Sequence, residues 1–139
     1  MRDEILRVSS IGDRRVKDFI PKVVNIEKRL PETVPIEWLL MQMPFPLIYA
    51  VYKEDGIQVL NCVNLLSIIA SYLDNNFKLS GLHFLEEFEG KSFSQLEPWA
   101  RRRIEDYTFR VHIIDSSSKP SMENLDTLIH MLQVLKALQ

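Results

Sequence analysis

The residues that could carry chemistry include the segment 61–65, Asn-Cys-Val-Asn-Leu, which stands where a predicted strand meets a predicted helix. A phosphate-processing site at such a junction uses glycine, which lets the backbone approach a phosphate, and charged side chains that contact it. This segment has neither glycine nor charge, and its polar groups are the amides of Asn61 and Asn64 and the thiol of Cys62. It is therefore a polar turn without charge.

Cys62 is the only cysteine, and no histidine stands near it in the sequence. Free cysteines are among the most buried residue types, so a packed thiol is favoured over a nucleophile. A single cysteine also excludes an intrachain disulfide and a zinc site built from cysteines. His83, His112 and His130 lack the close spacing of metal ligands and are interpreted as structural or surface histidines. We therefore expect no metal and no cofactor.

The charged clusters fit solvated surfaces better than a catalytic or phosphate-binding site. Glu86 and Glu89 stand at helical spacing and could form a carboxylate pair, but such acidic runs are usually solvated faces. The three consecutive arginines at 101–103 would fan out around a helix, so they do not form one phosphate-binding stripe. The four glycines are scattered along the chain and form no phosphate loop.

The composition sets further bounds on the function. A chain of 139 residues, 46% hydrophobic and 26% charged, fits one globular domain at 1–139 that buries its own core. The formal net charge of −2 does not indicate binding to nucleic acid or a membrane. The N-terminus has acidic residues and no apolar core, so we expect no signal peptide, and no apolar run is long enough for a membrane span. We expect a cytoplasmic protein.

Strong local signals predict the elements that position the 61–65 turn. Pro35 and Pro44 bracket a helix whose apolar residues recur at the spacing of one buried face. Asp55-Gly56 predicts a hairpin over 46–60, because this dipeptide favours a tight turn between strands. A helix over 64–76 follows, ending at an asparagine pair that favours a helix cap.

Together with the flanking regions, these elements predict a fold of the α+β class. We expect a small mixed sheet with flanking helices. At the N-terminal end we expect a strand over 5–10, a charged helix over 12–19 and a short strand from residue 19. At the C-terminal end we expect a helix over 95–107 and a half-buried strand over 108–115.

The last predicted element is an amphipathic helix over 121–138 with Ser121 as its N-cap. Its apolar stripe more often packs on the chain's own sheet than on a partner, although a homodimer through this helix stays open. The stripe consists of Leu125, Leu128, Ile129, Leu132 and Leu135.

From Trp38 onward the features follow a specific order. A helix leads to "PFP", then come a strand "LIYAVY", a hairpin, a strand-to-helix turn and "FKLSGL". "EGKSFSQL", an arginine-rich helix and a strand "YTFRVHII" follow. In this order and spacing the chain resembles the N-terminal domain of the bacterial GmrSD-type modification-dependent restriction systems, which implies a ParB/sulfiredoxin-like fold. The resemblance covers roughly residues 20–115.

Two short motifs are thought to carry the chemistry of that family. The first, I-P-x-Y-Q-R, corresponds to 20–25, where Val24 and Asn25 replace the glutamine and arginine. The second, D-G-Q-Q-R, corresponds to 61–65, where the aspartate is Asn61, the glycine Cys62 and the arginine Leu65. The resemblance thus implies a former site that has lost its charges. Its candidate residues are Pro21, Val24, Asn25, Asn61, Cys62, Asn64 and Leu65.

Two functions remain open on this basis. The first is a catalytically inactive relative that acts as a binding or regulatory module in DNA-related defence. Its target would be a partner protein or, with less support from the charge, nucleic acid. The second is an enzyme with a diverged nucleotide- or DNA-processing site at the 61–65 turn, which would use Asn61, Asn64 and a nearby carboxylate such as Glu27. The loss of charge from both motifs favours the first, with no catalytic residue.

Overall fold

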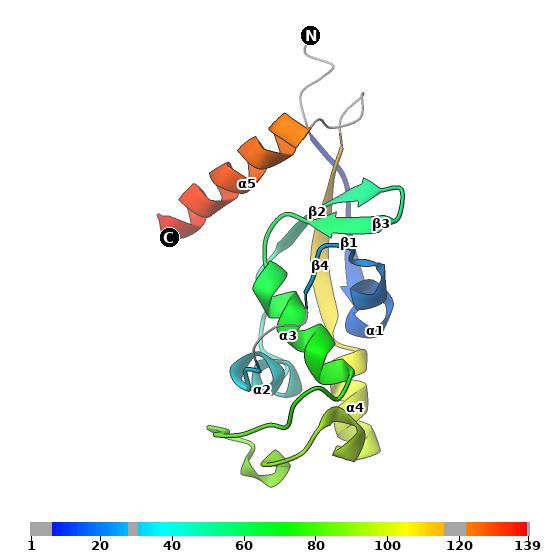
Figure 1. Cartoon of the computed structure of the whole chain (residues 1–139), viewed down its shortest axis with the longest axis vertical. Coiled ribbons are helices and arrows are strands. Elements are labelled where there is room, and N and C mark those ends of the chain that lie inside the picture. Colours follow the sequence, from blue (N-terminus) through cyan, green and yellow to red (C-terminus); the bar gives the residue numbers. More distant parts are fainter. Residues whose placement is uncertain (1–6, 28–30, 116–121, 139) are drawn as a thin grey trace.

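The computed structural model describes residues 7–27, 31–115 and 122–138. Within these ranges the strands form one four-stranded sheet in the order β1-β4-β2-β3, shown in Figure 1. The β1–β4 and β2–β3 pairs are antiparallel and the β2–β4 pair is parallel, so the sheet is mixed. The bounds are Arg7–Arg15 for β1, Ile48–Lys53 for β2, Gly56–Val59 for β3 and Thr108–Asp115 for β4.

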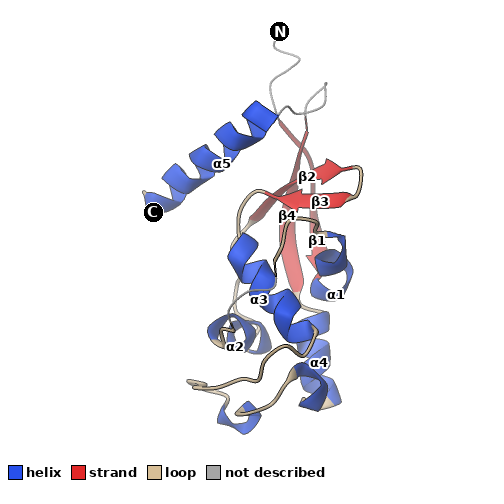
Figure 2. Ribbon diagram, viewed as in Figure 1, coloured by secondary structure: helices blue, strands red, loops and turns tan. Residues whose placement is uncertain are grey.

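Helices flank this sheet, which confirms the predicted α+β class (Figure 2). Short 3₁₀ turns occur at Ile20–Lys22, Glu86–Phe88 and Phe93–Gln95. No helix in the described part of the chain is long and apolar enough to cross a membrane. The helices are α1 at Val16–Phe19, α2 at Val34–Leu40, α3 at Val63–Leu73, α4 at Pro98–Glu105 and α5 at Met122–Ala137.

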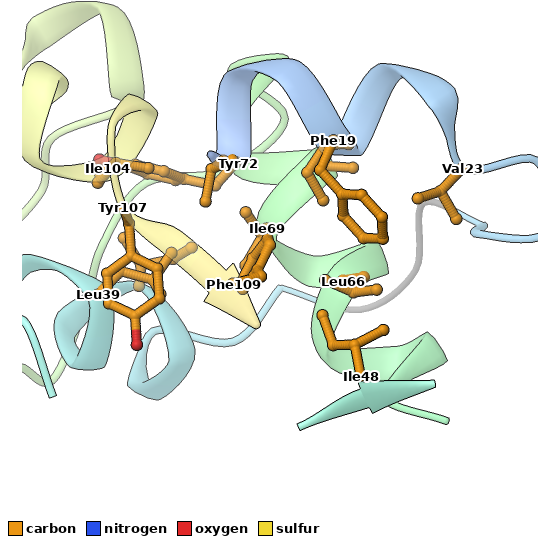
Figure 3. Close-up of a cluster of buried hydrophobic side chains, with 14 of the residues drawn as sticks. Phe19, Val23, Leu39, Ile48, Leu66, Ile69, Tyr72, Ile104, Tyr107 and Phe109 are labelled. Atoms are coloured by element: carbon orange, nitrogen blue, oxygen red, sulfur yellow. The ribbon is translucent and has the colours of Figure 1, made fainter. Parts of the chain in front are cut away.

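The main core lies between one face of the sheet and helices α1 to α4. On β4, Phe109, Val111 and Ile113 are buried while Arg110 is exposed, so the predicted alternation of this strand is confirmed. Figure 3 shows Leu66 and Ile69 of α3 in the same buried cluster as Phe109 of β4. The ring of Phe109 lies 5.9 Å from that of Phe19 and 4.8 Å from that of Phe45, measured between centroids.

The opposite face of the sheet packs against α5. Val51, Leu60 and Ile114 are buried there together with Leu125 of the helix. Leu128, Ile129 and Leu132 pack on the same cluster and are partly buried, whereas Leu135 is 60% exposed. Four of the five stripe residues therefore contact the chain's own sheet. The predicted N-cap, Ser121, lies outside the described residues.

Two predictions for the N-terminal region are wrong. The segment 12–15, predicted to be helical, continues strand β1, and only Val16–Phe19 forms a helix. β1 pairs only with β4, and charged side chains are common on such edge strands. Residues 20–22, predicted as the start of a strand, form a 3₁₀ turn with Pro21 near its start, where the missing N–H costs nothing. Only Val23 adds a bridge, parallel to Ile57 of β3.

Candidate functional site

The 61–65 turn lies at a strand-to-helix junction, because β3 ends at Val59 and α3 begins at Val63. This prediction is confirmed. Cys62 adopts the left-handed conformation there, with φ of 62° and ψ of 19°. Glycine reaches this region without steric cost, whereas other residues lose roughly 1–2 kcal/mol. The backbone therefore has the conformation that suits glycine at the position where the resembled motif has one.

The amide of Asn61 is bonded to the backbone of β2. Its Nδ2 donates to the carbonyl oxygen of Leu47 at 2.8 Å, and its Oδ1 accepts from the N–H of Tyr49 at 2.8 Å. The N–H of Leu60 also donates to the carbonyl oxygen of Tyr49, at 2.7 Å. The side chain thus extends the hydrogen bonding between β2 and β3 beyond the last strand residue.

Asn25 forms the same kind of contact on the outer edge of β3. Its Nδ2 donates to the carbonyl oxygen of Val59 at 2.8 Å, and its Oδ1 accepts from the N–H of Val59 at 2.9 Å. One side chain therefore satisfies both backbone groups of an edge-strand residue, as a neighbouring strand would. Asn25 and Asn61 therefore both hold the β2–β3 hairpin.

The chain before Asn25 crosses the hairpin closely. The N–H of Val24 donates to the carbonyl oxygen of Ile57 at 2.8 Å. A Cβ at Gly56 would collide with the carbonyl oxygen of Lys22 and lie 2.7 Å from Cγ1 of Val24. Gly56, predicted for its turn-forming role, is therefore also required for this crossing.

Leu65 lines an open groove of about 440 Å³ beside the turn. The indole of Trp38 forms one wall, and its Nε1–H donates to the carbonyl oxygen of Pro44 at 2.6 Å. Trp38 is 39% exposed and Val34 is 49% exposed, so the groove is accessible to solvent. Among the described residues, no ionisable side chain lines it. The lining consists of Val34, Pro35, Trp38, Pro44, Phe45, Pro46 and Leu65.

A buried carboxylate lies on α2, next to the helix residues that line this groove. Glu37 is 4% exposed and accepts three backbone N–H groups, from His83 at 3.1 Å, Phe84 at 2.7 Å and Leu85 at 3.0 Å. Burial raises the pKa of this carboxyl, but the three N–H donors and the nearby His83 outweigh it, so its pKa is lowered. Sequence reasoning took Glu37 only as part of a helix and missed this contact. The one local signal is its place on a helix between buried Ile36 and Leu40.

Two further side chains hold the same loop. Oγ1 of Thr33 accepts from the N–H of Ser80 at 2.9 Å, and the carboxylate of Glu89 accepts from the N–H groups of Gly81 and Leu82. Phe84, at the centre of the Glu37 contact, is itself 73% exposed. The loop thus presents an exposed aromatic ring on a backbone fixed by hydrogen bonds. Figure 1 shows this loop running beneath α2.

The remaining candidate groups have structural contacts. Arg101 donates to the carbonyl oxygens of Ser94 and Leu96, and Arg103 donates to that of Leu40 at 3.0 Å. The arginine run therefore does not form one anion-binding stripe. Burial raises the pKa of the Cys62 thiol to about 11, so the thiol is protonated at neutral pH.

The seven candidate residues do not line a common cavity. Leu65 is the only one on the groove, and Pro21 is the only one on a second cavity of about 520 Å³ near the hairpin turn. Asn64 is exposed, and the N–H of Glu27 donates to Oγ of Ser67 at 3.0 Å. Across the described residues, no group of three or more His, Cys, Asp or Glu side chains is placed to hold a metal ion.

Comparison with known proteins yielded no match to this chain among family models, curated proteins or solved structures.

Proposed function

We propose that this chain is a catalytically inactive relative of the GmrSD-type restriction-system domain, with a ParB/sulfiredoxin-like fold, that acts as a protein-binding module in DNA-related defence. The observation that carries the proposal is the uncharged groove beside the 61–65 turn, lined by Trp38, Leu65 and a set of proline and valine side chains. Its single partly buried cysteine suits a reducing compartment such as the cytoplasm.

The state of the motif residues supports an inactive site. An acid, a base or a phosphate ligand needs a polar group directed at the substrate. Asn25 and Asn61 instead direct their amides at the backbone of the hairpin. Leu65, at the motif's arginine position, contributes only apolar surface to the groove. No side chain in the groove lining could stabilise a developing negative charge.

The chemistry of the groove supports a protein partner. Aromatic and other large side chains that fill fixed pockets dominate the energy of protein interfaces. Trp38 is held by its hydrogen bond to Pro44, and prolines have little conformational freedom to lose on binding. Rigid walls reduce the entropy cost of association. We therefore expect the partner to insert an apolar side chain between Trp38 and Leu65.

One experiment tests the absence of catalysis. The purified protein is assayed for hydrolysis of nucleoside triphosphates and for DNA cleavage, with and without divalent cations. The thermal midpoint is measured with the same nucleotides, because a ligand that binds the native state raises it. We expect no turnover, and no shift of the thermal midpoint that is lost in Asn61→Ala. Metal-dependent turnover that disappears in Asn61→Ala would instead establish the alternative function, an enzyme with a diverged site at the turn.

A second experiment tests the groove. Peptides are selected on the immobilised protein from a random library, and their affinity is measured for wild type, Leu65→Glu and Val34→Glu. Ile11→Glu is the matched control, since Ile11 is 53% exposed on strand β1 and does not line the groove. We expect the groove variants to lose binding while the control retains it. Equal binding by all four proteins would refute the groove as the binding site.

A further inference from the structure

The second cavity, of about 520 Å³, lies at the turn of the β2–β3 hairpin and shares no lining residue with the groove. Three separate segments form it: the end of β1, the 3₁₀ turn after α1 and the hairpin itself. Cavities of this size commonly hold small molecules. The lining consists of Arg14, Pro21, Lys22, Tyr52, Lys53, Glu54, Asp55, Gly56 and Ile57.

Three cationic residues, one from each of these segments, line the cavity. They are Arg14 of β1, Lys22 of the 3₁₀ turn and Lys53 of β2. Within the described residues, none of the three forms an ion pair. Other basic residues of the same region behave differently, since Arg15 pairs with Asp18 at 3.0 Å and Lys17 pairs with Asp106 at 3.3 Å. The three cavity cations therefore keep their charge available for a ligand.

A hydrogen bond holds the arginine over the cavity. Nη2 of Arg14 donates to the phenolic oxygen of Tyr52 at 3.2 Å, although β4 separates β1 from β2 in the sheet. The guanidinium has five N–H donors, and this contact uses one of them. The others can bind two oxygens of one anion, which is the arrangement that arginine forms with phosphate.

The two acids of the lining limit what the cavity can bind. Glu54 and Asp55 form the hairpin turn, next to Lys53, and both are exposed. A long polyanion such as a nucleic-acid strand would pass these carboxylates and be repelled by them. A single compact anion can contact Arg14, Lys22 and Lys53 without approaching both acids.

We propose that this cavity binds one phosphate group, either as inorganic phosphate or as the head of a small phosphomonoester. Arg14 contacts two of its oxygens, Lys22 and Lys53 neutralise its charge, and the hydroxyl of Tyr52 donates a further hydrogen bond while accepting from Arg14. Gly56 and Ile57 are also part of the cavity lining. The inference uses none of the groove residues, although Pro21 and Lys22 of the cavity belong to the 20–25 segment.

The test is a titration followed by two-dimensional amide NMR at constant ionic strength, using inorganic phosphate, glycerol phosphate and chloride. We expect saturable shifts at 14, 22 and 52–57 with the two phosphates and none with chloride. A phosphomonoester that binds more tightly than inorganic phosphate would identify the head group of a small molecule as the natural ligand, and the reverse order would identify the free ion.

Arg14→Gln keeps a donor for Tyr52 and should weaken phosphate binding by about tenfold or more, since it removes a charged bidentate contact. Lys53→Gln tests the same site if Arg14→Gln does not fold. Arg102→Gln, on the exposed side of α4, is the matched control and should bind as the wild type does. Equal affinity in all variants, or shifts that do not saturate, would overturn the proposal. So would tighter binding of a short single-stranded oligodeoxynucleotide that depends on Arg14, because it would identify a nucleic-acid surface instead.

Discussion

Helix α2 and the 61–65 turn each present a polar side chain to the interior and apolar side chains to the groove. On the interior side, Glu37 accepts three backbone N–H groups of the 83–85 loop, and Asn61 bonds the backbone of Leu47 and Tyr49. On the groove side, Trp38 and Leu65 are partly exposed and have no charged neighbour in the lining. Helix α2 also buries Ile36, Leu39 and Leu40, so Glu37 is a single charged exception on an otherwise apolar interior face.

The difference between the two sides separates residues that stabilise the fold from residues that are available to bind a partner. The side chains capable of acid–base or polar chemistry hold loops and strands that are distant in sequence. The accessible side chains can contribute binding energy only when a partner buries them. Changes on the interior side should therefore affect stability, and changes on the groove side should affect binding.

The largest effect is expected for Glu37→Ala. It removes three charge-assisted hydrogen bonds and leaves three N–H groups without their acceptor, so the free energy of unfolding should fall by about 4 kcal/mol. Chemical denaturation measures this. Glu87→Ala is the control, since Glu87 is exposed in the same region, and should change stability by less than about 0.5 kcal/mol. Equal stability of the two variants would mean that water replaces the Glu37 carboxylate at little cost.

The same carboxylate makes a prediction for pH. The pKa of Glu37 is lowered in the folded protein, so folding favours its ionised form. The resulting stabilisation is complete above the pKa of the unfolded chain, about 4.3, and is lost as the pH falls through the lower folded pKa. The stability difference between wild type and Glu37→Gln should therefore be constant near neutral pH and shrink in acid. A difference that grows in acid would contradict the lowered pKa.

A smaller loss is expected for Asn61→Asp, which introduces the aspartate of the resembled motif. An oxygen would replace Nδ2 and face the carbonyl oxygen of Leu47, so a donor is lost and two acceptors meet. We expect a cost of about 2 kcal/mol at neutral pH, and less in acid, where the protonated carboxyl can donate. Asn64→Asp is the matched control, because Asn64 is exposed in the first turn of α3, where an acid is favourable.

Leu65→Arg should stay folded, with a change below about 1 kcal/mol, because the arginine can extend from the groove into water. Leu66→Arg provides the contrast, since Leu66 is fully buried and an unpaired charge there should prevent folding. Thermal melts of both proteins measure the difference. A Leu65→Arg protein without a cooperative melt would show that the groove side is as closed as the core.

The smallest effect is expected for Cys62→Gly. Glycine removes the cost of the left-handed conformation, about 1 kcal/mol, but loses the packing of the thiol and increases the entropy of the unfolded chain. These terms nearly cancel. Cys62→Ala keeps the conformational cost and loses the sulfur contacts, so it should be less stable than Cys62→Gly. The opposite order in denaturation would show that the φ of Cys62 carries little strain.

Sequence patterns were reliable where local signals decide the structure. The signal of Pro35 located α2, although the helix begins at Val34 and ends at Leu40, before Pro44, and the pattern of 108–115 identified β4. The strand at 12–15 was missed because its charges suggest a helix, while pairing with β4 determines its conformation. The role of Glu37 was missed because its partners lie 46 to 48 residues away.

The candidate site was predicted only where local signals decide the structure. Helix geometry places Leu66 in the core and its neighbour Leu65 outside it, and both positions agree with the structure. The contacts of Asn25 and Asn61 could not be read from residue type, since an amide can bond a ligand or a backbone equally well. The packing of residues 23–25 along β3 decides this for Asn25, and the position of Asn61 beside Leu47 and Tyr49 decides it for Asn61.

The pairing of β1 with β4 has a consequence for the order in which the chain acquires structure during synthesis. The paired residues of β1 have partners on β4 that are made about a hundred residues later. The β2–β3 hairpin and α3 are contiguous and can form while the rest of the chain is still being translated. β1 emerges first but has no strand to pair with until β4 has left the ribosome. Non-local pairing of this kind slows folding, so β1 should be the last strand to gain protection against amide exchange.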